Sequence, residues 1–109
     1  ACDMAKSGAA RLAGMEPPSH PDDETTFAQL QARIDKVLAF IDSVPRAAIE
    51  GSEARRIVVP TRERTFEFLG QAYLLGWVLP NFYFHMTTAY NILRHCGVAL
   101  GKKDFLGGE

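Results

Sequence analysis

The sequence predicts a single, mainly α-helical domain with one short β-hairpin. Three observations support this class: a capped amphipathic helix at 26–43, a segment at 73–97 that is apolar on nearly every face, and two short β-type runs at 56–60 and 65–69. A helix that is apolar all round must be buried. We therefore expect the amphipathic helix to pack antiparallel against the long apolar one. A chain of 109 residues is one domain at most.

Composition excludes several function classes. Acidic and basic residues nearly cancel, to a net charge of −1, so the chain has no electrostatic footprint for nucleic acid. The apolar run at 73–84 is too short to span a bilayer, and no secretory signal is visible at the start. Cys2 and Cys96 fit neither a disulfide framework nor a paired metal motif. We expect a cytoplasmic protein that binds neither nucleic acid nor membrane.

The first residues already have the pattern of a helix interior. The apolar positions at helical spacing are Cys2, Ala5, Ala9 and Leu12. Lys6 and Arg11 fall on the other side, and Gly14 with the two prolines after it ends the run. Ala1 is not a capping residue. We therefore expect that a longer polypeptide has lost its N-terminal part.

The second helix has clear start and stop signals. It follows an acidic, proline-rich loop at 16–23 in which His20 is expected on the surface. Thr26 and Gln29 form a capping box, and Pro45 closes the helix. The apolar stripe expected to face the long helix comprises Phe27, Leu30, Ile34, Val37, Leu38 and Ile41.

The two β-type runs predict a hairpin with Phe66 and Phe68 on one face and Glu67 on the other. Gly70 ends it, and the long apolar segment begins. Pro80 should either start a second helix or kink a continuous one.

The last turn of the long segment holds Arg94 and His95, where cations suit the helix dipole, and Gly97 is a natural residue to follow the helix. The glycine-rich tail at 100–109 should lie on the surface, pinned by Phe105 and Leu106.

Asn81 and His85 form the candidate site, because residues four apart share one face of a helix. Two interpretations remain open. His85 is either a buried core histidine with a hydrogen-bond partner or a metal ligand, and Asn81 is either a cap after Pro80 or part of the same site. The aromatic residues expected in the core and interface are Tyr73, Trp77, Phe82, Tyr83, Phe84 and Tyr90.

The segments 79–85 (LPNFYFH), 87–90 (TTAY) and 92–95 (ILRH) resemble an uncharacterised bacterial family of the DinB/YfiT-like superfamily of metalloenzymes. The segments 11–14 (RLAG), 73–76 (YLLG) and 101–108 (GKKDFLGG) are similar too. The resemblance covers essentially the whole chain. It implies an up-and-down four-helix bundle, often dimeric, of which residues 1–109 would be the C-terminal two-thirds. The hairpin would lie between the last two helices.

The resemblance also implies a degenerate metal pocket. Superfamily members that bind zinc or nickel use one histidine on the second helix and two spaced i, i+4 on the last. Here Asn81 stands in place of the first of that pair and His85 in place of the second. The second-helix position would fall at or before Ala1. An amide oxygen is a weak ligand beside imidazole, so we expect no cofactor in this chain.

Two functions therefore stay open. The first is a dimeric bundle of unknown biochemical function. The alternative is a divalent-metal-dependent thiol transferase or hydrolase with His85 as a ligand; the sequence does not decide whether the protein is an enzyme. Fold likeness cannot choose between them, because function lies in the site.

Overall fold

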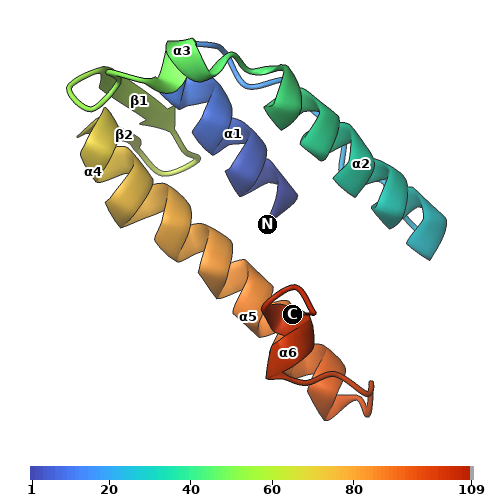
Figure 1. Cartoon of the computed structure of the whole chain (residues 1–109). Coiled ribbons are helices and arrows are strands. Elements are labelled where there is room, and N and C mark those ends of the chain that lie inside the picture. Colours follow the sequence, from blue (N-terminus) through green and yellow to red (C-terminus); the bar gives the residue numbers. More distant parts are fainter. Residues whose placement is uncertain (109) are drawn as a thin grey trace.

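The structure, a computed structural model, describes residues 1–108 and is mainly helical with one two-stranded antiparallel sheet (Figure 1). In chain order the elements are α1 (Cys2–Leu12), α2 (Phe27–Ser43), α3 (Arg46–Ile49), β1 (Arg56–Pro60), β2 (Thr65–Leu69), α4 (Gly70–Tyr73), the π-helical η1 (Leu74–Val78), α5 (Leu79–His95) and α6 (Lys102–Phe105). The predicted fold class and the position of the hairpin are confirmed. Residues 1–108 contain three long helices, and the four-helix bundle of which they would be a part stays a prediction.

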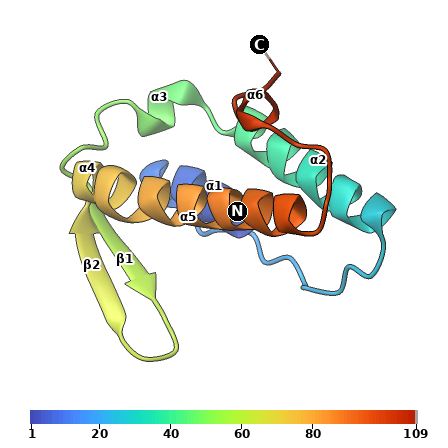
Figure 2. The ribbon, with the colours of Figure 1, turned by 90° about the horizontal axis from the view of Figure 1, so that it is seen from below.

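The three long helices are arranged with α1 in the middle (Figure 1). α1 contacts α2 on one side and η1 and α5 on the other. α1 and α2 run in the same direction and are joined by a long connection, residues 13–26, whereas α4, η1 and α5 form one rod that runs the opposite way. The hairpin projects from one end of this layer (Figure 2). None of the helices within residues 1–108 combines the length and apolarity needed to cross a membrane.

α1 forms as expected and ends at Leu12; two residues later Gly14 turns the chain with a φ of +74°, which suits glycine. The Nη1 of Arg55 donates a hydrogen bond of 2.8 Å to the carbonyl of Leu12, which satisfies one of the free carbonyls at this helix end. Lys6, on the side of α1 opposite the apolar positions, does not face solvent. Its side chain is buried between the helices and pairs with Asp3 at 3.0 Å.

The capping box of α2 is confirmed. Thr26 Oγ1 accepts a hydrogen bond from the backbone N–H of Gln29 at 3.1 Å, and Gln29 Oε1 accepts one from the N–H of Thr26 at 3.0 Å. The helix then ends at Ser43, two residues before Pro45, because a residue that precedes proline is disfavoured in the helical region.

The predicted partner of α2 is wrong. α2 packs on α1, not on α5, and buries Val37 with Arg33 and Phe40 beside it. The residues of the predicted stripe that instead remain exposed are Phe27, Leu30, Ile34 and Leu38. Phe27 is 91% exposed. The periodicity identified the apolar face correctly, but it carried no information about what covers that face.

The hairpin and α4 build the core. β1 and β2 pair with Ile57 opposite Phe68 and Val59 opposite Phe66, so these four side chains lie on one face. Phe66 and Phe68 lie partly buried there, whereas Glu67 points to solvent, as predicted. The buried core cluster consists of Leu12, Ile57, Val59, Tyr73 and Val78, with Trp77 against both phenylalanine rings at 4.9 and 5.5 Å.

The long rod is continuous through Pro80. Its π-helical turn directly precedes the proline, and such a turn absorbs a local disruption of helical hydrogen bonds without ending the helix. The rod ends where predicted: Arg94 and His95 lie in the last turn, and Gly97 follows with φ +88°.

Beyond the rod, Phe105 packs edge-on against Tyr90 at 5.5 Å and holds α6 on α5. Leu106 is exposed, so only one of the two expected tail anchors is correct.

Candidate functional site

Asn81 and His85 lie on the line of α5 that continues, four residues at a time, through Ala89 and Leu93. Ala89 and Leu93 line a groove, which we define by its full lining: Ala1, Cys2, Asp3, Asp22, Glu24, Leu30, Arg33, Ile34, Ala89 and Leu93. The groove has a volume of about 620 Å³. Asn81 and His85 therefore lie on the same side of α5 as the two residues that line the groove.

The level of His85 along the layer follows from one close contact. A Cβ at Gly8 would lie 2.7 Å from the Cγ1 of Val78, so α1 and the rod touch at this pair. Because the two helices run in opposite directions, seven residues back along α1 and seven forward along α5 cover the same distance. His85 is therefore level with Ala1.

The side chain of Asn81 bonds to the backbone of its own rod. Its Nδ2 donates a hydrogen bond of 2.7 Å to the carbonyl of Trp77, inside the π-helical turn. The wider π-helical turn leaves some backbone carbonyls without a good hydrogen-bond donor, and a side-chain amide can donate to them. The structural role expected for Asn81 beside Pro80 is thus favoured, although as a bond to a carbonyl within the rod and not as an N-terminal cap.

The expectation that His85 is buried and hydrogen-bonded is wrong. Its imidazole is exposed, and its ring lies against Phe84 at 5.3 Å. Tyr83 and Phe84 are exposed too, so within residues 1–108 they are not core residues, and their expected place in an interface stays a prediction. The cause is the same as for the stripe on α2: within residues 1–108, α6 lies against Tyr90 on the outer half of α5, but the side that carries His85 is left exposed.

The residues present do not fit a zinc or nickel ion. Within residues 1–108, no three His, Cys, Asp or Glu side chains converge as a metal would require. His85 offers one imidazole, and the nitrogen end of the Asn81 amide is engaged by a carbonyl. A transition-metal site needs at least three such ligands.

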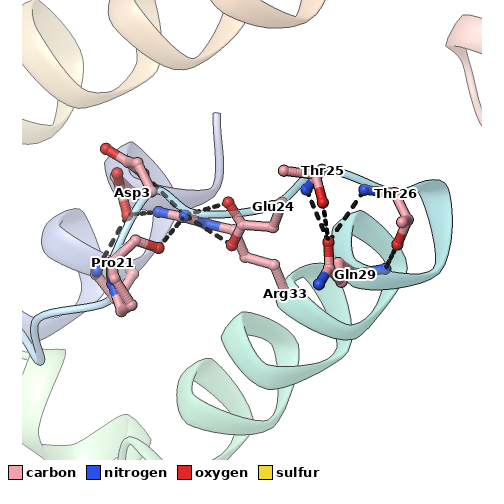
Figure 3. Close-up of polar contacts among 9 residues, drawn as sticks. Asp3, Pro21, Glu24, Thr25, Thr26, Gln29 and Arg33 are labelled. Carbon is pink, nitrogen blue, oxygen red and sulfur yellow. Dashed lines mark hydrogen bonds and ion pairs between the residues drawn. The ribbon is translucent and has the colours of Figure 1, made fainter.

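The polar wall of the groove is organised by Arg33, which sequence reasoning did not single out (Figure 3). Its guanidinium donates to Asp3 at 2.9 Å, to Glu24 at 3.0 Å and to the carbonyl of Pro21 at 3.0 Å, and it pairs with Asp22 at 2.8 Å. Only 10% of its side chain is exposed. Arg33 thereby ties α1, the connection 13–26 and α2 together.

These contacts determine the electrostatics of the wall. Burial alone would raise the pKa of Asp3, but hydrogen bonds from Lys6 and Arg33 outweigh it and hold that pKa below its usual value. The pKa of Glu24 is lowered by a bond from its own backbone N–H and by Arg33. Both carboxylates therefore stay ionised, and both are bonded to the guanidinium of Arg33.

His20 is not a plain surface residue, contrary to expectation. It lines a small hollow of about 230 Å³ between the connection and α2. Its Nδ1 is buried and has no hydrogen-bond partner within residues 1–108. Burial, followed by Lys6, Lys36 and Arg33, lowers the pKa of His20 below its usual value, and Asp3 offsets only part of this.

A sequence signal for this cluster existed in part. Asp3 and Lys6 are spaced i, i+3 on a helix, which predicts an ion pair. Arg33, however, comes from the next helix and its carboxylates from a loop, and such convergence is set by the tertiary packing alone.

Comparison with known proteins places the chain among proteins of similar sequence and fold. A family model described as a domain of unknown function, DUF1993, matches residues 1–106. Among solved structures, the crystal structure of a DinB family member protein from Shewanella denitrificans superimposes with a TM-score of 0.85 at 41% sequence identity. The match covers 99% of this chain and 61% of that one, so this chain spans less than two-thirds of the relative's length. A search of curated proteins found no match.

Proposed function

The chain belongs to the DUF1993 family of domains of unknown function, and from this premise we propose that it is a DinB-like helical protein that dimerises through its open groove and carries a degenerate metal pocket. Residues 1–109 then correspond to the C-terminal two-thirds of a DinB-like four-helix bundle. The match to 61% of the DinB family member at a TM-score of 0.85 supports this assignment.

The observation that carries the proposal is the apolar surface on both sides of the groove. Leu30 and Ile34 on α2 and Leu93 on α5 line the groove and are exposed, and Phe27 and Leu38 continue the same exposed face of α2. Soluble monomers rarely expose a contiguous apolar surface of this kind, and an exposed one marks an interface.

The area is sufficient for a stable association. The chain exposes 7865 Å², whereas a compact monomer of this size exposes about 6,000 Å². The excess is about 1,900 Å² per chain. Two copies that each buried this excess would form an interface of about 3,800 Å², which lies in the range of obligate homodimers. We therefore propose that a second copy of this chain occupies the groove.

Sedimentation equilibrium on residues 1–109 tests the dimer. We expect the mass of two chains over the micromolar range and one cooperative unfolding transition whose midpoint rises with concentration. A folded monomer that leaves the groove open would contradict the proposal. The proposal would also be contradicted if one chain instead bound a separate helical segment corresponding to the part of the DinB family member that this chain does not match.

The alternative function is a divalent-metal-dependent enzyme of the thiol transferase or hydrolase type, with His85 as a ligand. One observation favours it: His85 is exposed and level with Ala1, as a ligand shared with the second helix would need to be. Elemental analysis of protein purified without a chelating tag, beside the variant His85→Ala, separates the two functions. Zinc or nickel at about one ion per chain that is lost in His85→Ala would support the enzyme and contradict the degenerate pocket.

A further inference from the structure

We propose that the connection between α1 and α2, residues 13–26, is a pH-sensitive latch whose closed form depends on a neutral His20. This device lies within one chain and does not involve His85, so it is separate from the metal pocket; its residues Asp22 and Glu24 also line the groove proposed for the dimer.

The first observation is geometric. His20 belongs to the connection and faces α2 across the small hollow lined also by Arg33 and Lys36. Its Nδ1 is buried without a partner. A neutral imidazole can leave that nitrogen as an unprotonated acceptor, whereas a protonated ring would carry a second buried N–H and a full charge.

The second observation is the charge around the ring. α1 contributes Lys6 and Asp3, and α2 contributes Arg33 and Lys36. The connection itself brings Asp23 and Glu24 to the same hollow. Asp3 and Glu24 already accept hydrogen bonds from Lys6 and Arg33. These four groups are therefore paired with one another, and Lys36 adds a further positive charge that faces the ring across the hollow.

Protonation of His20 consequently favours release of the connection. The closed form holds the pKa of His20 below its usual value, mainly through burial, while a released connection returns it to about 6.5. The released form therefore binds more protons, and the latch weakens as the pH falls from about 6.5 toward the pKa of the closed form. Each unit of difference between the two pKa values changes the opening equilibrium about tenfold. Release would also move Asp22 and Glu24 away from Arg33, which would open the polar wall of the groove.

The test combines two measurements on the full chain between pH 5 and 8. Proton NMR follows the titration of His20, and hydrogen exchange, corrected for the intrinsic rate, follows the amides of residues 13–26 with those of β1 and β2 as an internal reference. We expect a His20 midpoint below about 6.5. We also expect protection of 13–26 to fall on acidification while the hairpin keeps its protection.

Two variants keep the test decisive. Lys36→Gln removes one exposed cation that faces the ring, so the His20 midpoint should rise and the loss of protection should shrink. Lys102→Gln makes the same change on α6, which is outside the cluster, and should alter neither. A His20 midpoint at or above 6.5 would overturn the latch. Protection in 13–26 that does not change with pH, or that changes equally in His20→Gln, would overturn it as well.

Discussion

At the scale of single residues, close approach of backbones explains the glycine that joins the hairpin to the long rod. A Cβ at Gly70 would lie 1.9 Å from the carbonyl oxygen of Ser52. That oxygen also accepts a hydrogen bond of 3.0 Å from the N–H of Arg55, so it cannot move freely. Only glycine lets the rod begin at this distance from the loop that precedes β1.

We predict that Gly70→Ala destabilises the chain by at least about 2–3 kcal/mol, because backbone must shift to relieve the overlap. Gly76→Ala is the matched control. No atom lies within 4 Å of its added Cβ, and alanine should stabilise a helical position by up to about 1 kcal/mol. Urea unfolding of both variants measures the difference. Equal stabilities of the two variants would contradict the contact with Ser52.

Acid stability depends on Arg33. The pKa values of Asp3 and Glu24 are lowered in the folded chain, so their contribution to stability is complete above their unfolded values of about 4. It is lost as the pH falls through the lower folded values. We predict that Arg33→Gln is less stable at neutral pH and loses less further stability between about pH 4 and 2.

Unfolding midpoints in urea across that range provide the measurement. Arg62→Gln, in the exposed loop of the hairpin, is the control and should retain the acid dependence of the parent chain. An unchanged acid dependence in Arg33→Gln would show that the carboxylates are stabilised by other groups.

At the scale of elements, the sequence predicted what is encoded locally. The capping box, the proline and glycine stops and the alternation of Phe66, Glu67 and Phe68 each act within a few residues, and all are present in the structure. The burial of Lys6 and the convergence on Arg33 depend on how α1, α2 and their connection pack. No periodicity within one helix contains that information.

The capping box allows a prediction for α2. Thr26→Ala should destabilise the helix by about 1 kcal/mol, since it leaves the N–H of Gln29 without its acceptor. Gln29→Ala removes the reciprocal bond. A double-mutant cycle should give a positive coupling between them, because the two bonds hold the same turn. Strictly additive effects would mean that the two bonds form independently.

At the scale of the whole molecule, the fold is less compact than its size allows. The radius of gyration is 15.4 Å, against about 13 Å for a compact domain of this length. The sequence correctly predicted that the long rod is apolar, yet it could not say which half would be covered. η1 is covered by α1 and the hairpin, whereas the side of the outer half of α5 that carries His85 is exposed. The position of His85 in the open half explains why its expected burial was wrong.

The open groove leads to the last prediction. If a second copy occupies it, a charge placed in its apolar lining must be desolvated on association, at a cost that a close hydrophobic contact cannot recover. Ile34→Lys should therefore shift sedimentation from dimer to monomer. Each 1.4 kcal/mol of association free energy that is lost raises the dissociation constant about tenfold. Leu69→Lys is the control, since Leu69 is also exposed, at 57% against 42% for Ile34, but lies on the outer face of the hairpin, away from the groove. Monomers in both variants, or dimers in both, would place the interface elsewhere and remove the groove from the proposed function.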